Sequence, residues 1–329
     1  MATNKKKLLI VESMAPGGWA LFRERSDIEA IEFSNTISAA DFNAMLRQHA
    51  PVNGVALGGT AFGQNEIESS GEMMVVARIG VGYDAVDVPA LSAKKIPLMT
   101  TGIANSPSVA ECALFMMLSL AKRSAELDHL VKSGNWGNRL KAIPYDILGK
   151  TALVVGFGRI GTRLVKRLIA MEMKVQVYDP FKSAAEINAS GAEYVADLDA
   201  ALPYADFVTL HCPKSPATIN FFDAARIAKM KRTAFLINTA RGGVVNERDL
   251  HAALVAGTIA GAGIDVFEKE PPPADNPLFK LDNVIVAPHV AGVTREALDR
   301  MGLQTAKNML SALDGAPIRE NVINQDVLS

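Results

Sequence analysis

Residues 151–161, TALVVGFGRIG, decide the fold of this chain. The first five, a threonine and four apolar residues, predict a strand, and residues 160–170 after them predict a helix. Between the two lies a G-x-G-x-x-G pattern, and Asp179 stands 18 residues beyond Gly161, at the end of a second predicted strand. A glycine pattern alone is a weak signal, but strand, glycine turn, helix, strand and acid in this order predict a dinucleotide-binding βαβ unit.

Each conspicuous residue of this unit has a physical role. Gly156 permits a tight turn, Gly158 lets the backbone approach a pyrophosphate, and Gly161 allows close packing of helix on strand. The free N–H groups of the helix N-terminus, with Arg159 and Ile160 beside them, complete the expected anion site. A glycine-rich turn with a purely structural role is the alternative.

The nature of the cofactor follows from Asp179. Its carboxylate is suited to accept hydrogen bonds from the adenosine ribose hydroxyls and to repel a 2'-phosphate, so NAD is favoured over NADP. Lys182 lies nearby in the sequence and softens that preference.

The rest of the chain alternates short β-rich runs with helical stretches, which is typical of parallel sheets covered by helices. With 329 residues the chain exceeds what one hydrophobic core usually fills, so we expect two domains. We predict a small α/β domain first, a border near residue 102, and a doubly wound sheet after it. The expected strands are 7–11, 52–57, 74–79, 97–99, 152–155, 174–178, 207–210, 234–238, 260–264 and 284–287.

Composition and charge exclude several classes of function. The formal net charge is −1 with both signs interspersed, so we expect no binding of nucleic acid and no attraction to anionic lipid. The apolar stretch 109–121 is shorter than the roughly 20 residues that a membrane span needs, and it predicts a buried helix. Cys112 and Cys212 have no metal-ligand or disulfide spacing, and no metal is expected. These features favour a cytoplasmic protein.

Three polar residues follow successive predicted strands of the second sheet. Arg241 follows strand 234–238, Glu270 lies in the loop after strand 260–264, and His289 follows strand 284–287. Ligands of open α/β sheets bind beyond the carboxyl ends of the strands. Oxidation of a 2-hydroxy acid needs a cation for the carboxylate, a base for the hydroxyl proton and a group that orients the base. We assign these roles to Arg241, His289 and Glu270 in that order.

Each of these residues also has an ordinary interpretation as a surface charge, a solvated loop acid or a structural histidine, and only their joint placement supports the assignment. His211 is the competing base, because it too follows a strand, but no similarly placed carboxylate accompanies it. The second glycine cluster, Gly80-Val81-Gly82, follows a strand as well. Its N–H groups suit a small carboxylate, and a loop shaped only for packing is equally compatible.

With these motifs together, the chain resembles the D-isomer-specific 2-hydroxyacid dehydrogenases, which include phosphoglycerate dehydrogenases, glyoxylate and hydroxypyruvate reductases and D-lactate dehydrogenases. The resemblance covers essentially the whole length. It rests on the glycine loop, on Asn238-Thr239-Ala240-Arg241-Gly242, on Gly263 to Phe267 with Glu268-Lys269-Glu270-Pro271, and on Ala287-Pro288-His289.

The resemblance implies functions for further residues. Arg241, Glu270 and His289 become the catalytic set, with Glu270 preferred to Glu268 because it directly precedes a proline. Val81 and Gly82 would bind the substrate carboxylate together with Arg241 and His289. The other cofactor contacts that it implies are His211, Cys212, Pro213, Thr239, Ala240, Arg241, Asp265, which would meet the nicotinamide carboxamide, and His289.

The resemblance also implies an architecture and a substrate class. A Rossmann cofactor domain, 103–292, is inserted into a flavodoxin-like substrate domain, 1–102 with 293–329, and two copies form a homodimer through the cofactor domains. The segment 57–63 is small and uncharged, which disfavours a phosphorylated substrate, although Arg78, Arg139 or Lys141 could approach from elsewhere. A small 2-keto or 2-hydroxy acid is therefore expected, with D-3-phosphoglycerate dehydrogenase, formate dehydrogenase and a dinucleotide-sensing corepressor or scaffold as the alternatives.

Overall fold

The computed structural model describes residues 5–328 and divides into two compact units. The first unit runs up to Asn105 and resumes at Val293, and the second unit is Ser106–Gly292. The predicted borders after residue 102 and before residue 293 lie within three residues of these. The chain thus enters the second unit at a helix and leaves it directly after the segment that carries His289.

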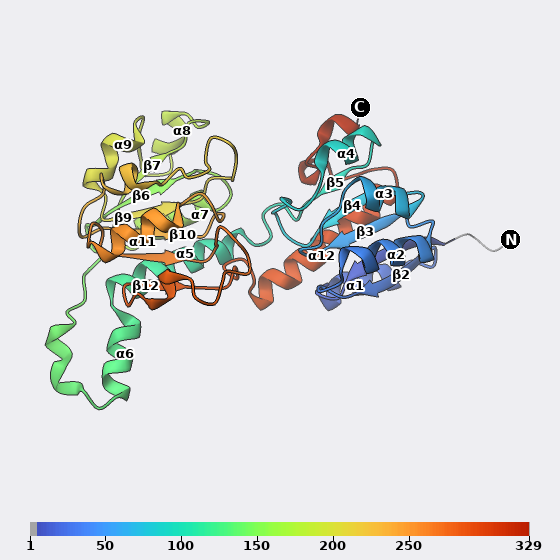
Figure 1. Cartoon of the computed structure of the whole chain (residues 1–329). Coiled ribbons are helices and arrows are strands. Elements are labelled where there is room, and N and C mark those ends of the chain that lie inside the picture. The colour runs from blue at the N-terminus through green and yellow to red at the C-terminus, as the bar shows by residue number, and fades with distance from the viewer. Residues whose placement is uncertain (1–4, 329) are drawn as a thin grey trace. The chain divides into compact units, whose positions relative to one another are not determined.

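The first unit is a five-stranded, all-parallel sheet in the order β2-β1-β3-β4-β5. This is the flavodoxin-like order that the resemblance implies. Phe42, Ile67 and Leu91 of α2–α4 pack on one face, and α1 and α12 cover the other (Figure 1). The elements are β1 Lys6–Val11, α1 Pro16–Arg23, β2 Ile28–Phe33, α2 Ala39–His49, β3 Gly54–Leu57, α3 Gln64–Ser70, β4 Val75–Arg78, α4 Val88–Ala93, β5 Leu98–Met99, α12 Arg295–Leu313, η4 Arg319–Asn321 and η5 Gln325–Leu328.

The sequence did not predict β2. Its residues, IEAIEF, carry two glutamates and form the edge strand beside β1. Only Ile28 and Phe33, at its two ends, are buried. Ala30 and Ile31 between them pack on the core while partly buried, so the strand lacks the regular alternation of apolar and polar residues that identifies strands.

The second unit is a seven-stranded parallel sheet in the order β12-β11-β10-β9-β6-β7-β8. It is the doubly wound order of dinucleotide-binding domains. Helices α5, α7 and α8 cover one face, and α9, α10 and α11 cover the other. The elements are α5 Ser106–Ala121, α6 Ser124–Lys132, η1 Trp136–Lys141, β6 Thr151–Val155, α7 Gly161–Ala170, β7 Lys174–Tyr178, α8 Ala184–Asn188, β8 Glu193–Tyr194, α9 Leu198–Ala201, η2 Leu202–Tyr204, β9 Phe207–Leu210, α10 Ala224–Ile227, β10 Phe235–Asn238, α11 Glu247–Val255, β11 Gly261–Ile264, η3 Pro277–Lys280 and β12 Val284–Val286.

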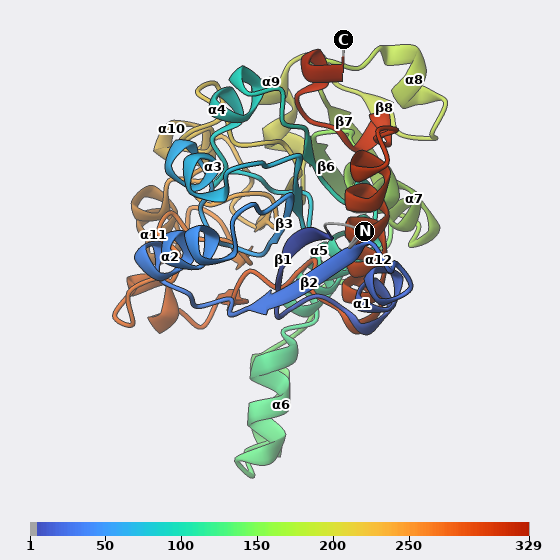
Figure 2. The same ribbon diagram turned by 90° about the vertical axis from the view of Figure 1, so that its right-hand side faces the viewer.

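One part of this unit leaves the sheet. Helix α6 and the short helix η1 contain no buried residue, and Figures 1 and 2 both show α6 standing away from the sheet of its own unit. We call residues 122–148 the arm. No helix within residues 5–328 combines the length and the apolar character needed to cross a bilayer.

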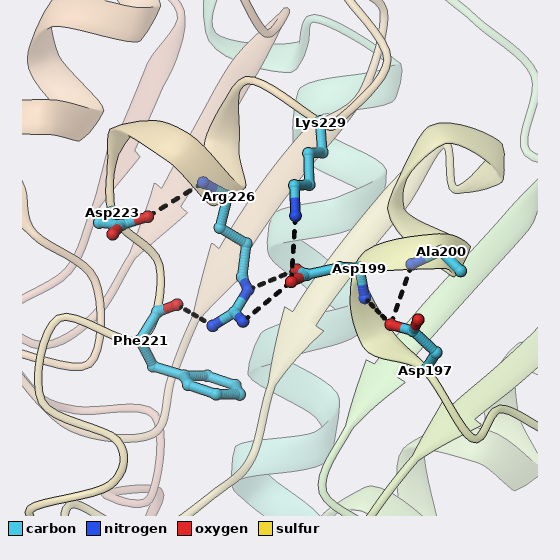
Figure 3. Close-up of polar contacts among 7 residues, drawn as sticks. All are labelled: Asp197, Asp199, Ala200, Phe221, Asp223, Arg226 and Lys229. Atoms are coloured by element: carbon cyan, nitrogen blue, oxygen red, sulfur yellow. Dashed lines mark hydrogen bonds and ion pairs between the residues drawn. The ribbon is translucent and has the colours of Figure 1, made fainter.

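A polar cluster ties α9 to α10 (Figure 3). Arg226 Nε donates to Asp199 Oδ1 at 2.7 Å, and its guanidinium carbon lies 4.4 Å from the centroid of the Phe221 ring. Lys229 adds a second ion pair to Asp199, at 3.1 Å. These contacts hold the pKa of Asp199 down, at about 2, mainly through the hydrogen bond from Arg226. The cluster therefore stabilises the second unit while its carboxylate is ionised.

Candidate active site

The glycine loop after β6 is shaped by close contacts of its backbone. Gly156 has φ +102°, and a Cβ there would lie 2.8 Å from the carbonyl carbon of His211. A Cβ at Gly161 would lie 2.0 Å from Gly156 O, so α7 packs onto the turn only because that side chain is absent. Gly158 has open space where its Cβ would be. The loop is thus tight toward the protein and open on its middle glycine, which fits the approach of a pyrophosphate.

Asp179 lies at the end of β7 and holds this loop. Its Oδ2 accepts a hydrogen bond from the Phe157 N–H at 2.7 Å, and its Oδ1 accepts one from the Phe181 N–H at 2.9 Å. A carboxylate offers about four acceptor positions, so two remain for ribose hydroxyls. Lys182 is engaged elsewhere, because its Nζ lies 2.7 Å from Glu186 Oε1.

Asn238, the last residue of β10, shapes the turn that carries Arg241. Its Oδ1 accepts a hydrogen bond from the Ala240 N–H at 3.0 Å, and its Nδ2 donates to the Arg241 carbonyl at 3.1 Å. Within the turn, Oγ1 of Thr239 is buried without a hydrogen-bond partner among the described residues. A buried polar atom without a partner is costly, and this one fits a site that a polar cofactor completes.

Asp265 joins β11 to the segment after β12. The residue is 1% exposed, and its two carboxylate oxygens accept hydrogen bonds from the Val290 and Ala291 N–H groups at 2.9 and 3.0 Å. Burial raises the pKa of this carboxyl, and the two N–H donors counteract that rise. The His289 N–H also donates to the Asp265 carbonyl, at 2.8 Å. Asp265 thereby holds the backbone on which the imidazole stands.

His289 and Glu270 form a hydrogen-bonded pair. The distance from His289 Nδ1 to Glu270 Oε2 is 2.6 Å, and Glu270 Oε1 accepts a hydrogen bond from the Phe267 N–H at 3.0 Å. The second ring nitrogen, Nε2, has no hydrogen bond to any residue within 5–328, and the side chain is 49% exposed. A carboxylate therefore orients the imidazole through Nδ1, while Nε2 is accessible for proton exchange.

Glu268, the nearby alternative to Glu270, is used in a different contact. Its Oε1 accepts a hydrogen bond from the Glu247 N–H at 2.8 Å, and its own N–H donates to the Glu247 carboxylate. These reciprocal bonds tie the loop after β11 to Glu247, the first residue of α11. The structure thus places Glu270, and not Glu268, against the histidine.

His211 directly follows β9; the residue is partly exposed, but its ring is desolvated, and this decides its chemistry. Its Nε2 is 2.9 Å from Thr209 Oγ1, and its Nδ1 is inaccessible to solvent and has no partner among the described residues. Burial lowers the pKa of His211 to about 3, so the ring is neutral near pH 7 and is not the imidazolium that a general acid would have to be. Burial also raises the pKa of Cys212 next to it to about 11, which keeps that thiol protonated.

Arg241, Glu270 and His289 follow β10, β11 and β12, which are adjacent parallel strands, so all three leave the same edge of the sheet. Arg241 is half-buried, with its Nη1 donating to the Ala240 carbonyl at 2.7 Å. Val81 and Gly82 belong to the first unit, in the loop after β4, where Arg78 Nε donates to the Gly82 carbonyl at 2.8 Å. Sequence reasoning missed the turn-forming role of Asn238, although a polar residue at a strand end is a usable signal.

Comparison with known proteins adds to this geometry. The family model described as "D-isomer specific 2-hydroxyacid dehydrogenase, NAD binding domain" matches residues 114–291. D-3-phosphoglycerate dehydrogenase of Archaeoglobus fulgidus is 39% identical over 258 residues, which are 78% of this chain and 48% of that protein. Glyoxylate reductase of Korarchaeum cryptofilum is 37% identical over 264 residues, 79% of each protein.

Solved structures agree with these relatives in fold. NAD-dependent formate dehydrogenase from Staphylococcus aureus, determined in complex with NAD, has a TM-score of 0.83 and 25% identity. That alignment covers 96% of this chain and 98% of the other. The chain spans about half the length of the phosphoglycerate dehydrogenase that it matches.

Proposed function

Because this chain belongs to the D-isomer specific 2-hydroxyacid dehydrogenases and carries their NAD binding domain, we propose that it transfers a hydride between NAD and a small D-2-hydroxy acid or its 2-keto form. The observation that carries the proposal is the Glu270–His289 pair, which lies at the same sheet edge as Arg241. A cation beside an oriented, accessible imidazole is what a reacting 2-hydroxy acid needs.

In this proposal, residues of the second unit have different roles in the reaction. NAD, when bound, accepts or supplies the hydride. Arg241 binds the substrate carboxylate through its planar guanidinium. His289 takes the hydroxyl proton at Nε2 during oxidation and returns a proton to the carbonyl oxygen during reduction, and Glu270 orients the ring and stabilises its charged form. Val81 and Gly82 of the first unit remain our proposed further contacts for the carboxylate.

The cofactor contacts are proposed on the same basis. Gly156, Gly158, Arg159, Ile160 and Gly161 would hold the pyrophosphate at the N-terminus of α7, and Asp179 would hold the ribose. The nicotinamide half would lie along the ends of β9, β10 and β11. Its contacts there would be His211, Cys212, Pro213, Thr239, Ala240, Arg241, Asp265 and His289.

A matched pair of variants tests the catalytic assignment. Glu270→Gln keeps the size of the side chain but removes its charge, and we expect kcat/KM for the keto acid to fall by about 10²-fold or more, within the range of general acid–base contributions. Glu268→Gln makes the same change two residues earlier, on a glutamate that bonds to Glu247, and should keep kcat/KM within about threefold of the unchanged enzyme. Equal losses in the two variants would remove Glu270 from its proposed role.

The substrate that we favour is glyoxylate or hydroxypyruvate. The small, uncharged segment 57–63 supports this choice over a phosphorylated acid. D-3-phosphoglycerate dehydrogenase is the second candidate, since a relative with that name is 39% identical. The test compares kcat/KM for glyoxylate, hydroxypyruvate and phosphohydroxypyruvate with NADH. No turnover on a broad panel of 2-keto acids would favour a dinucleotide-sensing role instead.

We further propose that two copies form a homodimer through their cofactor domains, in the cytoplasm. The support comes from apolar side chains exposed on the second unit: on the arm Trp136 is 62% and Leu140 is 74% exposed, and Phe115 of α5 is 59% exposed. Large apolar side chains that gather into one exposed patch usually mark an interface. Leu140→Glu should shift the mass measured by light scattering from dimer to monomer.

The proposed cytoplasmic location agrees with the cysteines. The free thiols of Cys112 and Cys212 fit a reducing compartment.

A further inference from the structure

Three charged residues follow β7: Asp179 directly after the strand, Lys182 in the next loop and Glu186 in α8. Asp179 is tied to the glycine loop, and three residues later the Lys182 N–H donates to the Asp179 carbonyl at 3.3 Å. The Lys182 ammonium forms an ion pair with Glu186, in which Nζ lies 2.7 Å from Oε1. Glu186 lies in the first turn of α8, where its own N–H donates to Ser183 Oγ at 3.2 Å. The acid that holds the lysine is therefore itself placed by a capped helix.

This arrangement bears on the choice between NAD and NADP. A protein that accepts the 2'-phosphate of NADP presents a cation close to the acidic position that otherwise binds the ribose. Lys182 is such a cation by position, since its backbone bonds directly to Asp179. Its charge is countered by Glu186, and the three side chains together carry a net charge of −1 + 1 − 1 = −1. A dianionic phosphate would therefore meet a site with an excess of negative charge.

We propose that Glu186 is a positioning residue for cofactor choice: it holds Lys182 in an ion pair and so keeps that lysine from receiving the 2'-phosphate of NADP. The inference rests on the proposed role of Asp179 at the ribose. Glu186 does not touch the ribose in this scheme and acts only through Lys182. Asp179 repels the phosphate directly, and Glu186 holds the positive charge of Lys182, which would otherwise offset part of the repulsion.

The experiment measures cofactor binding without turnover. Dissociation constants of NADH and NADPH are measured from nicotinamide fluorescence for the unchanged enzyme, Glu186→Gln, Lys182→Met and the double variant. Glu126→Gln is the control, because the Arg123–Glu126 pair on the arm has a separation of 2.6 Å and a glutamate side chain that is 48% exposed, the same exposure as Glu186. Both variants lose one exposed ion pair and one negative charge.

We expect Glu186→Gln to bind NADPH about two- to fivefold more tightly, the scale on which an exposed ion pair competes, with NADH binding unchanged. The gain should shrink at high salt and disappear in the double variant. Glu126→Gln should leave both constants unchanged, and Lys182→Met alone, which leaves a net charge of −2 on the remaining acids, should not tighten NADPH binding. Unaltered NADPH binding in Glu186→Gln, or a gain that persists without Lys182, would overturn the proposal. Because binding is measured directly, its failure is distinct from a failure of the proposed chemistry.

Discussion

Replacing Gly242 with alanine should displace the catalytic pair by pushing apart two segments of backbone. Gly242 follows Arg241, and a Cβ at this position would lie 1.6 Å from the Phe267 carbonyl oxygen. Real Cβ atoms essentially never come closer than 3.0 Å to such an atom, so the two segments must separate by about 3.0 − 1.6 = 1.4 Å. Both contacting groups are backbone, and neither can rotate out of the way as a flexible side chain would.

The displacement reaches the catalytic pair through one residue. The Phe267 N–H donates to Glu270 Oε1, and Glu270 Oε2 bonds to His289, so moving Phe267 shifts the carboxylate that orients the imidazole. A misplacement of about 1 Å can cost about 10²-fold in rate. We therefore expect Gly242→Ala to lower kcat/KM for the keto acid by about 100-fold. Overpacking should also lower the free energy of unfolding by about 1–3 kcal/mol.

The assay combines steady-state kcat/KM with NADH, the Tm, and the dissociation constant of NADH. Gly17→Ala is the control, since Gly17 lies in α1 with no atom within 4 Å of its Cβ position. That variant should keep its activity and gain about 0.5–1 kcal/mol of stability. If Gly242→Ala retained kcat/KM within about threefold of the unchanged enzyme, the contact with Phe267 would not be what places Glu270.

Three further predictions concern other sites of the second unit. Arg241→Lys keeps the charge but loses the planar, two-pronged grip, so kcat/KM for the keto acid should fall by about 10²-fold while the dissociation constant of NADH changes less than about twofold. Asp179→Ala removes both the ribose acceptor and the repulsion of a 2'-phosphate, so the NAD-to-NADP ratio of kcat/KM should fall by about tenfold, and an unchanged ratio would show that Asp179 does not bind the ribose. Asp199 has its pKa lowered from 3.8 to about 2, chiefly by Arg226, so its stabilising contribution is present above pH 4 and is lost as the pH falls through 2. Solvent screening leaves about 1 kcal/mol of that contribution. In urea titrations, Asp199→Asn should therefore lower the free energy of unfolding by about 1 kcal/mol at pH 7 and by much less at pH 2, where the carboxylate of the unchanged protein is itself being protonated.

Much of the second unit follows from the sequence alone. Its buried parallel strands are mostly apolar runs, and its glycine loop combines a turn, a helix start and an acid at fixed spacing. These are local features, because strand and turn preferences depend on neighbouring residues. The placement of Arg241 and His289 after strands follows from the same patterns, since parallel neighbours end at one edge.

Pairing and burial depended on the tertiary structure. Glu268 and Glu270 are two residues apart in one acidic loop, and only the folded chain shows that Glu247 engages the first while His289 engages the second. His211 and His289 both follow strands, yet desolvation lowers the pKa of His211 to about 3 while His289 stays half exposed beside a carboxylate.

The same division applies at the cofactor's ribose end. The sequence predicts Asp179 as the ribose acid and places Lys182 near it, because both belong to one short segment after a strand. Whether that lysine is available to a phosphate depends on Glu186, which the first turn of α8 brings to within 2.7 Å of it. Local preferences determine which residues reach the edge of the sheet, whereas charge and hydrogen bonding among them are set by distances in three dimensions.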